Sequence, residues 1–394
     1  MHISANNPNK TYKGKFMSYS DIIKNNKQWI DQTFEKLDKK LSRTAVKSRY
    51  IIPYSTKDGV HTNMAKSDIT WWTNGFWGGM MWLMYNATKN PEYLMTAKQS
   101  ERILERSFEQ IDGLHHDVGF MFHLTSGAAY RLTDDKNSRV TALLAAMMLS
   151  SRYNAKGEFI RAWNIPNSEG WTIIDSMMNI PLLYWASKEV GDERFKYIAV
   201  KQADMCARDH VRDDGTVNHI VVHDIDNPGK VIETRGGQGY GVGSCWSRGQ
   251  SWAVYGFILS YIHTKDQKYL DTARKVADLF IEETEKTDWL PRCDFRQPET
   301  PVKYDSTAGA ITACGLIEIA KNLPEPEAEK YLSAAINILK AMEKNWCDWT
   351  ENDDSILQMG KEEYHYGEHR NIIYGDFYFT EAILKLKGSD FLIW

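Results

Sequence analysis

Five stretches of this chain open with aromatic or acidic residues and continue as uncharged, apolar segments long enough to form helices. They begin at Trp71, Trp171, Trp246, Asp305 and Ile372, and a looser sixth member begins at His116. A helix that is apolar on all sides must be buried on all sides. Because the polar and aromatic residues gather at the same end of every segment, we expect these ends to converge on one pocket.

Amphipathic segments alternate with the apolar ones. We expect outer helices near residues 18–40, 91–108, 137–152, 192–210, 266–285 and 325–344, each followed by a buried helix. A Tyr-Leu-x-x-Ala pattern recurs from Tyr93, Tyr269 and Tyr331 and puts the ring and the alanine on one helix face. Six such hairpins predict an all-α fold, an (α/α)6-barrel, because TPR-type and HEAT-type repeats do not bury one helix completely.

The composition is that of one large globular domain. The 394 residues are 42% apolar and 25% charged, and no Pro/Gly/Ser-rich linker or block of like charge marks a boundary. We therefore expect a single catalytic domain over residues 1–394, in which residues 1–15 form a polar N-terminal extension. The net charge of −4 argues against nucleic acid as a partner, and no segment has the ~18 uncharged residues of a membrane span.

The N-terminal residues lack the apolar core of a signal peptide, and the five cysteines are scattered without a Cys-x-x-Cys pair. Neither a disulfide framework nor a zinc knuckle is indicated. These features predict a cytoplasmic protein with reduced cysteines. They carry no signal for an oligomeric state.

Two acids stand at the heads of neighbouring apolar segments. Asp117 and Asp175 are each surrounded in the sequence by aromatic and apolar residues. Burial raises the pKa of a carboxyl group, and a neighbouring carboxylate raises it further, which yields a proton donor at neutral pH. Because Asp near a helix N-terminus also commonly caps the helix, both acids are candidates for catalysis and for capping.

A third group suits an anionic ligand. Arg248, Trp252 and Tyr255 share one helix face directly after a long loop. A guanidinium at the pocket mouth with an aromatic ring beneath it fits a sugar carboxylate and the apolar face of the sugar. The alternative is a structural arginine paired with a loop acid. Trp72 and Trp163 also lie near the expected mouth, and tryptophan rings stack on pyranoses.

The stretch from Arg212 to Ser244 is too long for a simple connection and is expected to form a wall of the pocket. Strand signal within it is limited to short stretches such as residues 217–222. His115-His116-Asp117 and His219-x-x-x-His223-Asp224 invite a metal-ligand interpretation, and residues 236–243 invite a phosphate-loop interpretation. The Val-rich residues 218–222 argue against helical ligand spacing, and the glycines lack a preceding strand and a Lys-Ser/Thr pair, so we expect neither metal nor cofactor.

Five short motifs occur in a fixed order: HDVGF at residues 116–120, WN at 163–164, IDSMMN at 174–179, RGQSW at 248–252 and GDFY at 375–378. In this order and spacing they resemble the unsaturated glucuronyl hydrolases of glycoside hydrolase family 88. The resemblance runs from about Trp71 to Ile383, nearly the whole chain. The family has an (α/α)6-barrel, in agreement with the hairpin count.

The resemblance implies hydrolysis of the Δ4,5-unsaturated uronic acid at the non-reducing end of lyase-generated glycosaminoglycan oligosaccharides, so the expected partner is a small anionic oligosaccharide. It implies that Asp175 protonates C4 and then assists the water that attacks C5. Asp117 would hold ring hydroxyls and influence the charge of Asp175. Further substrate contacts are implied for His219, with His223 as its alternative, and for Gln238, Arg248, Trp252, Trp72 and Trp163.

Two departures from the family pattern concern substrate preference. Cys293 stands where many relatives carry a tryptophan, so one stacking wall is expected to be smaller. Sulfate-preferring relatives carry serines and a lysine before Gly-Asp, whereas residues 361–370 contain three acids and no serine. Because acids repel sulfate, we expect unsulfated disaccharides to react at least as well as sulfated ones, with Arg235 as the residue that would hold a sulfate otherwise.

Three other interpretations stay open at the level of sequence. One is an unsaturated rhamnogalacturonyl hydrolase acting on pectin fragments, although His-Asp before Val-Gly-Phe favours the glucuronyl hydrolases. Another is a conventional inverting glycosidase, which needs two carboxyl groups about 6.5–9.5 Å apart. The last is a non-catalytic α/α-toroid sugar-binding protein, which would keep the tryptophans but has no need for two acids at the mouth.

Overall fold

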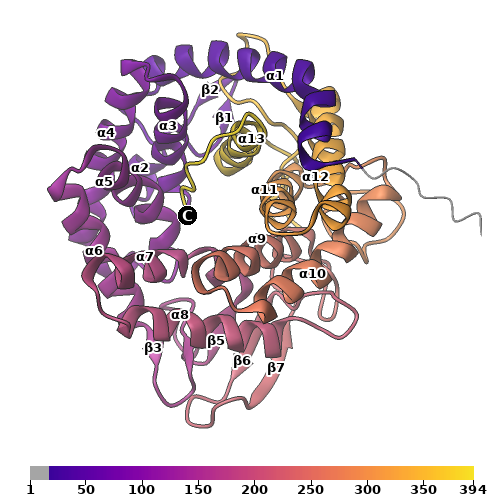
Figure 1. Ribbon diagram of the computed structural model, residues 1–394. Helices are drawn as coiled ribbons and strands as arrows, with labels where there is room; N and C mark the ends of the chain where they lie inside the picture. Colours follow the sequence, from indigo (N-terminus) through magenta and orange to yellow (C-terminus); the bar gives the residue numbers. More distant parts are fainter. Residues whose placement is uncertain (1–16) are drawn as a thin grey trace, which may run out of the picture.

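The computed structural model describes residues 17–394, which form a ring of helices in two layers (Figure 1). The outer helices are α1 (Tyr19–Lys47), α4 (Pro91–Glu105), α6 (Lys136–Ser151), α8 (Arg194–Met205), α10 (Gln267–Glu285) and α12 (Glu325–Trp346). The inner helices are α3 (Asn74–Thr88), α5 (Ala128–Thr133), α7 (Pro181–Val190), α9 (Ser247–Thr264), α11 (Ser306–Lys321) and α13 (Ile373–Leu386). The fold is an (α/α)6-barrel, so the prediction from the six hairpins is confirmed. The polar extension predicted for residues 1–15 lies outside the described residues.

The repeated Tyr-Leu-x-x-Ala pattern has a structural explanation. Each tyrosine is buried against the preceding outer helix of the ring, and its hydroxyl donates a hydrogen bond to an aspartate there. The three pairs, with oxygen–oxygen distances of 2.7, 2.7 and 2.8 Å, are Tyr93 with Asp38, Tyr269 with Asp204 and Tyr331 with Asp278. The repeat therefore fixes how neighbouring outer helices sit beside one another.

Most of the length of the longer inner helices is buried, as their composition requires. In α9 every residue from Ser247 to Ser260 is buried, and in α11 every residue from Ser306 to Ala320 is buried. Asp305 begins α11 as a cap, because its side chain accepts the N–H of Thr307 (3.1 Å). The polar starts of these helices therefore lie inside the protein, where they can contribute to a site.

The predicted inner helix at Trp171 begins later than expected. Residues Trp171–Ile173 form strand β5, and regular helix begins only at Pro181. β5 pairs antiparallel with β6 (Ile220–His223), which pairs with β7 (Val231–Arg235). Trp171, Thr172 and Ile173 are a β-prone triplet, and the partner strand β6 supplies the ladder that makes them a strand. The predicted long loop is therefore partly a hairpin, in agreement with the short strand signal expected there.

Irregular helical turns occur close to the two acids. A π-helix, η2 (Gly119–Gly127), precedes α5, and a 3₁₀ turn, η3 (Ile174–Met178), precedes α7. Similar short turns, η1 (Arg106–Gly113) and η4 (Cys206–His210), follow α4 and α8. π-Turns within helices are frequently found at functional sites. The remaining elements are the short helix α2 (Met64–Ser67) and the two-residue strands β1 (Thr56–Lys57), β2 (Val60–His61), β3 (Tyr153–Asn154) and β4 (Phe159–Ile160).

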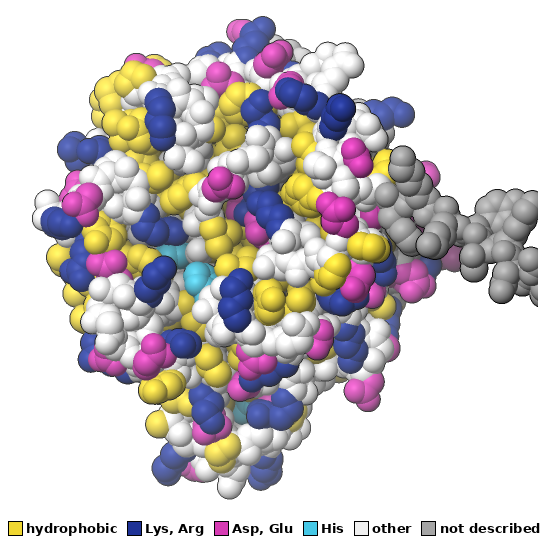
Figure 2. All heavy atoms as spheres, in the orientation of Figure 1, with side chains coloured by type: hydrophobic (Ala, Val, Ile, Leu, Met, Phe, Trp, Pro, Cys, Tyr) yellow, Lys and Arg dark blue, Asp and Glu magenta, His cyan; other side chains and the backbone are white. Residues whose placement is uncertain are grey.

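One hydrophobic core extends from Ile22 to Trp394 through all the helices of the ring. The C-terminal segment returns to the centre of the ring (Figure 1), where the Trp394 ring stacks on Tyr378 with centroids 5.8 Å apart. On the face shown in Figure 2, basic and acidic side chains are interspersed rather than gathered by sign. Among residues 17–394, no helix is both long enough and apolar enough to cross a membrane.

Candidate active site

Asp117 and Asp175 are joined by a single amide side chain. Asp117 lies just before η2, and Asp175 lies within η3. Asn179 Nδ2 donates to Asp117 Oδ1 (2.9 Å) and to the carbonyl oxygen of Asp175 (3.2 Å), and its Oδ1 accepts the N–H of Phe120 (2.8 Å). The two acids are 7% and 8% exposed. The irregular turns thus bring two nearly buried carboxyl groups together at the same end of neighbouring inner helices.

The pKa values of the two carboxyl groups are displaced in opposite directions. Burial, followed by the negative charge of Asp117, raises the pKa of Asp175 to about 7. For Asp117, burial also acts to raise the pKa, but His116, His115 and Asn179 together outweigh it, and the pKa falls below its usual value. Near neutral pH the site therefore contains a fixed carboxylate beside a carboxyl group that still holds its proton, which is the charge state that general acid catalysis requires.

His116 lies against Asp117 and the segment that precedes the strand at Trp171. Its Nδ1 lies 2.7 Å from the carbonyl oxygen of Ala162, and its Nε2 lies 3.1 Å from Asp117 Oδ1. Both ring nitrogens therefore face oxygen atoms, and the ring is held beside the Asp117 carboxylate from two sides.

The same residues form the metal-like cluster that the sequence suggests. Ligand atoms of His115, His116 and Asp117 all lie within 4.8 Å of one another. His115 Nδ1 is 3.4 Å from Asp117 Oδ2, so both carboxylate oxygens already face a histidine. Contacts of the two histidines with Asp117 account for the cluster, and its three ligand groups come from one short stretch of chain rather than from several elements. The donor set does not fit a dedicated metal centre.

His219 and His223 have different surroundings. His219 Nε2 lies 3.7 Å from Asp175 Oδ1, and its Nδ1 accepts the backbone N–H of Gln238 (3.1 Å). Because burial lowers the pKa of His219 to about 3, the ring is neutral at pH 7. Its Nδ1 also lies 3.4 Å from the carbonyl oxygen of Gly236, but the shorter contact with the N–H of Gln238 favours hydrogen on Nε2, toward Asp175. His223 Nδ1 instead lies 3.6 Å from Asp209 Oδ2. The structure therefore places His219, and not His223, beside the candidate acid.

A pocket of about 270 Å³, which we call the aromatic pocket, adjoins this group. Its lining is formed by Tyr54, Trp71, Trp72, Gln238, Arg248, Glu362, Glu363 and Tyr374. Gln238 connects the pocket with His219 through the hydrogen bond described above. Trp72 connects it with the acids on the other side, because its ring packs on Phe120 with centroids 5.5 Å apart. The size and the aromatic walls suit a single sugar ring.

Arg248 lines this pocket, but it is buried rather than open at the mouth. The residue is 1% exposed, and its guanidinium donates to Asp305 Oδ2 (2.5 Å) and to the carbonyl oxygens of Lys361 and Glu362. It also lies over the Trp246 ring, with Cζ 4.4 Å from the centroid. The expected exposure at the mouth is therefore wrong. The sequence left open the alternative that Arg248 pairs with an acid, and the structure shows this pair with Asp305. Arg248 lines the pocket as well.

Trp252 does not form a wall of the pocket. Its side chain is fully buried and packs against Phe120 and Tyr378, with ring centroids 5.2 and 5.7 Å away. The sequence places Trp252 one turn below Arg248 correctly, but aromatic residues from two other inner elements cover it. It supports the aromatic layer next to Trp72 and offers no free face to a sugar in this structure.

Trp163 and Arg235 lie at the far end of a row of aromatic contacts. Trp163 is half-buried, with its ring edge toward His116 (centroids 6.0 Å apart) and toward Trp171 (6.1 Å). Arg235 is exposed, with Cζ 4.1 Å from the Trp171 ring centroid, and it pairs with Glu233. These two residues are outside the aromatic pocket and next to the histidine–aspartate cluster.

Asn179 and Trp246 lie at the site, where the sequence interpretation placed the start of the Trp246 segment but assigned neither residue a contact. The Trp246 ring packs at a tilt against His219 with centroids 4.2 Å apart, so it limits the orientation of the ring that faces Asp175. The signals that could have found them were their places: Asn179 ends the IDSMMN motif, and Trp246 opens an apolar segment. Nothing in local spacing indicates that one amide contacts both acids, because Asp117 is 62 residues away.

Several buried polar atoms at this site have no hydrogen-bond partner. Within the described chain they include Asp175 Oδ1, His219 Nε2, Trp71 Nε1 and Trp246 Nε1. Each such atom requires an explanation. Hydroxyl and carboxylate groups of a bound ligand are suitable partners for them.

The family model described as Glycosyl Hydrolase Family 88 matches residues 45–261, which is more than half of the chain. This chain belongs to glycosyl hydrolase family 88. It is 35% identical over 334 residues to the unsaturated glucuronyl hydrolase of Bacillus sp. (strain GL1), covering 82% of this chain and 87% of that enzyme. The crystal structure of the unsaturated glucuronyl hydrolase from Bacillus sp. GL1 aligns with a TM-score of 0.84 at 31% identity, covering 91% and 97% of the two chains. This protein is thus a glycoside hydrolase, and the resemblance of its motifs to the unsaturated glucuronyl hydrolases is confirmed.

A second relative and two complexes bear on the substrate. The chain is 33% identical over 377 residues to the unsaturated chondroitin disaccharide hydrolase of Streptococcus pneumoniae, covering 93% of each. A mutant unsaturated glucuronyl hydrolase from Streptococcus agalactiae, solved with dGlcA-GalNAc6S, aligns with a TM-score of 0.78 at 27% identity, covering 93% of this chain and 94% of that one. A further neighbour, with a TM-score of 0.84 at 31% identity over 90% of this chain and 96% of that chain, holds dGlcA-Glc-Rha-Glc.

Proposed function

We propose that this enzyme releases the Δ4,5-unsaturated uronic acid from the non-reducing end of lyase-generated glycosaminoglycan oligosaccharides. The observation that carries the proposal is the pairing of a carboxyl group of raised pKa, Asp175, with a fixed carboxylate, Asp117, beside a pocket the size of one sugar. The relatives that share most of the chain are unsaturated glucuronyl and chondroitin disaccharide hydrolases, which supports the same substrate class.

The mechanism we propose is hydration of the vinyl ether. Asp175 donates its proton to C4, and the double-bond electrons form the new C–H bond while positive charge develops at C5 and the ring oxygen. Water then attacks C5, and the Asp175 carboxylate accepts one of its protons. The resulting hemiketal opens and releases the next sugar, so no bond to the anomeric carbon is broken by direct displacement.

The neighbours of Asp175 have separate roles in this proposal. Asp117 stays ionised, so its charge keeps the pKa of Asp175 high and stabilises positive charge that develops on the sugar. His219 Nε2–H, 3.7 Å from Asp175 Oδ1, orients that carboxyl group or a water beside it. Arg248 and Gln238 bind the uronate carboxylate and hydroxyls, and Trp72 packs on the ring. Trp163 and Arg235 contact the next sugar, next to the cluster of His116.

We also propose that unsulfated disaccharides react at least as well as sulfated ones. Glu362 and Glu363 line the pocket, and Arg370 Nη1 lies 3.4 Å from Glu362 Oε1, which offsets its charge. Lys361 is buried, and its ammonium donates to the carbonyl oxygens of Tyr366 and Gly367. A sulfate entering this pocket meets acids and cations that already have partners, and Arg235 lies outside the pocket and pairs with Glu233.

The decisive assay follows the ultraviolet absorbance of the conjugated uronate when the enzyme meets an unsaturated chondroitin or hyaluronan disaccharide. The proposal predicts loss of absorbance with the wild type and essentially none with Asp175→Asn. Retained absorbance with release of free sugar would instead indicate a conventional glycosidase, and binding without any product would indicate a sugar-binding protein. Activity confined to pectin fragments would favour the rhamnogalacturonyl hydrolases.

We place the enzyme in the cytoplasm. All five cysteines are free in the structure, and four of them, Cys206, Cys245, Cys293 and Cys314, are buried singly in the helical core, which suits a reducing compartment. Fractionation of the source cells with an antibody against the protein tests this. Recovery from the culture medium would contradict it.

A further inference from the structure

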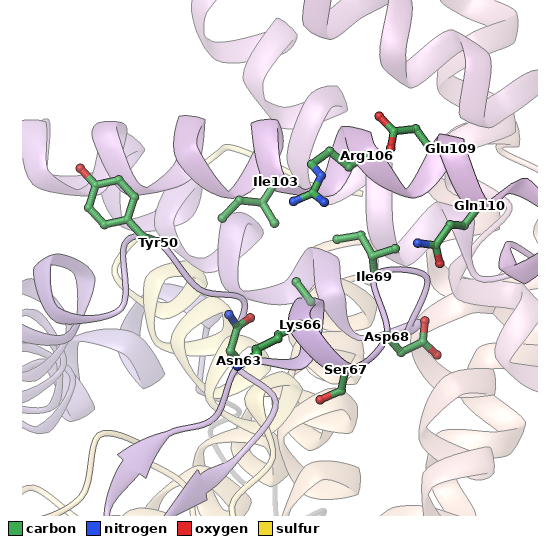
Figure 3. Close-up of a pocket in the computed structure, with 11 residues that line it drawn as sticks. Tyr50, Asn63, Lys66, Ser67, Asp68, Ile69, Ile103, Arg106, Glu109 and Gln110 are labelled. Atoms are coloured by element: carbon green, nitrogen blue, oxygen red, sulfur yellow. The ribbon is translucent and has the colours of Figure 1, made fainter.

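A larger cavity is separate from the aromatic pocket. It measures about 700 Å³ and lies between η1 on one side and the loop that contains α2 on the other (Figure 3). Its lining consists of Tyr50, Asn63, Ala65, Lys66, Ser67, Asp68, Ile69, Ile103, Arg106, Glu109 and Gln110. None of the contacts assigned above uses these residues.

Both walls of this cavity continue directly into the active site. Ile69, in one wall, is followed two residues later by Trp71, which lines the aromatic pocket. Gln110, in the other wall, is followed five residues later by His115 and the acid cluster. The walls meet where Gly113 touches Thr70: a methyl group added at Gly113 would lie 2.5 Å from Thr70 Oγ1. The cavity is thus adjacent to the site, on the outer side of one backbone contact.

The charges around the cavity favour an anion. Figure 3 shows the Arg106 guanidinium directed into the gap, whereas the Glu109 carboxylate points away from it. Asp68, the other acid of the lining, accepts hydrogen bonds from the N–H (2.8 Å) and the hydroxyl (2.7 Å) of Thr70. Between residues 17 and 394, neither Arg106 nor Lys66 forms an ion pair. The lining therefore contains two cations without a carboxylate partner, and of these the Arg106 guanidinium is directed into the gap, while one acid is held by Thr70 and the other points away.

The rest of the lining suits a saccharide. Tyr50 offers an exposed aromatic ring, and Ile69 and Ile103 form an apolar floor, as the faces of a pyranose require. Asn63 and Gln110 carry amides that both donate and accept hydrogen bonds, which matches sugar hydroxyls. The combination resembles the aromatic and polar surroundings of the aromatic pocket, with the cations in place of the acids.

We propose that this cavity is an outer subsite that binds the second uronate of a longer unsaturated oligosaccharide, through Arg106 and Lys66. This inference rests on the proposed function, because it assumes that the unsaturated end of the same chain occupies the aromatic pocket. That pocket holds one ring, so the following sugars must lie outside it, and the cavity is the nearest large space whose walls run out of the site. The enzyme then prefers anionic tetrasaccharides over disaccharides.

The test compares two unsaturated tetrasaccharides and one disaccharide as substrates. The hyaluronan tetrasaccharide carries a second uronate, whereas dGlcA-Glc-Rha-Glc has only neutral sugars after the first. In Arg106→Gln we expect the KM for the hyaluronan tetrasaccharide to rise about tenfold or more, as loss of one charge-assisted hydrogen bond predicts. The KM for the unsaturated disaccharide and for the neutral tetrasaccharide should stay unchanged, and Lys66→Gln should act in the same direction.

Arg102→Gln is the matched control, because Arg102 is an exposed arginine one turn earlier on α4 and outside the cavity lining. It removes the same charge from the same helix, so an equal effect there would mean long-range attraction only and would overturn the subsite. Equal KM values of wild type and Arg106→Gln for the hyaluronan tetrasaccharide would overturn it as well.

Calorimetric titration with a saturated hyaluronan tetrasaccharide, which has no double bond to react, measures binding without turnover. Binding that Arg106→Gln weakens and Arg102→Gln does not supports the cavity even if the proposed reaction fails. A sulfated chondroitin tetrasaccharide in the same titration shows whether a sulfate takes the place of the carboxylate. Loss of turnover on every substrate with this binding intact would contradict the proposed function and leave the subsite standing.

Discussion

At Asp175 the protein keeps a carboxyl oxygen, Oδ1, buried with no hydrogen-bond partner in the described chain, whereas Asp117 is held by Asn179 and flanked by two histidines. The sequence predicted both acids, because each precedes an apolar helix among aromatic residues. The residue pattern alone did not say which of them keeps the proton, whereas the family resemblance implied that Asp175 does. The difference in pKa between the two acids depends on His116 and Asn179, and the contact between Asn179 and Asp117 forms only in the folded chain.

The first prediction concerns the pH dependence of turnover. The acid must be protonated, so wild-type kcat should fall as the pH rises through about 7, the pKa of Asp175. Asp117→Asn removes the negative neighbour that raises this pKa, so the alkaline limb should move to lower pH and kcat should drop by ~10²-fold or more. Profiles of kcat against pH for the two proteins check this. An alkaline limb at the same pH in both would mean that Asp117 does not act on the acid.

The second prediction concerns stability. Asp175 has a raised pKa in the folded protein, so above its usual value near 3.8 the unfolded chain releases a proton that the folded chain keeps. The wild type therefore loses stability as the pH rises toward about 7, and Asp175→Asn does not. The variant should be more stable than the wild type above pH ~7, by at most ~4 kcal/mol, and the difference should shrink toward pH ~4. Urea unfolding across this range decides it, and a constant difference would contradict the burial of a neutral carboxyl group.

Arg248 shows where sequence spacing stops being informative. Spacing placed it at the start of an inner helix, but its burial follows from contacts with distant parts of the chain. Its partners are Asp305 and the carbonyl oxygens of Lys361 and Glu362, none of them near it in the sequence. Removing one partner of a buried ion pair costs about 3–5 kcal/mol.

We therefore predict that Arg248→Ala lowers the free energy of unfolding by about this amount, in addition to raising KM. Arg248→Lys keeps the charge and should recover part of the stability while KM stays high, because lysine lacks the planar fork. Denaturant unfolding and kinetics on the disaccharide test both statements. A fully stable Arg248→Ala protein would show that Asp305 does not depend on the guanidinium.

At the scale of elements, the six outer helices were predictable from their amphipathic pattern, and the inner helices from the length of their uncharged apolar segments. The strand at Trp171 was not, because so short a segment holds no helical or strand period, and its partner strand, β6, comes from the long loop. The irregular turns η2 and η3 could not be predicted from the sequence either. They depend on the close approach of two segments at Gly119, where an added methyl group would lie 2.6 Å from Asn179 Cα.

This close approach gives a prediction for the element that carries Asp117. Gly119→Ala forces η2 away from η3 and shifts the amide that joins the two acids, so kcat should fall by at least about tenfold. Gly241→Ala is the matched control, because the added methyl group there meets open space. Melting temperatures of both variants show whether the effect is local. Full activity of Gly119→Ala would mean that the spacing of η2 and η3 does not set the geometry of the acids.

At the scale of the whole molecule, the closed ring follows from the number of hairpins, since each inner helix needs neighbours on both sides to bury its apolar surface. The tyrosine–aspartate pairs between outer helices explain a repeat that the sequence displayed without a reason. The sequence does not predict which side chains occupy the centre of the ring. Trp394 packs there against Tyr378, below the aromatic residues that support Trp72, and no local pattern predicts that contact.

The central proposal is that the enzyme hydrates a double bond and does not cleave the glycosidic bond by attack at the anomeric carbon. Turnover of an unsaturated chondroitin disaccharide in D₂O, followed by NMR spectroscopy, tests it most directly. We predict loss of the vinyl proton signal and one solvent deuterium on C4 of the released uronic acid, with neither change for Asp175→Asn. A released sugar that keeps its double bond and carries no deuterium at C4 would contradict vinyl-ether hydration.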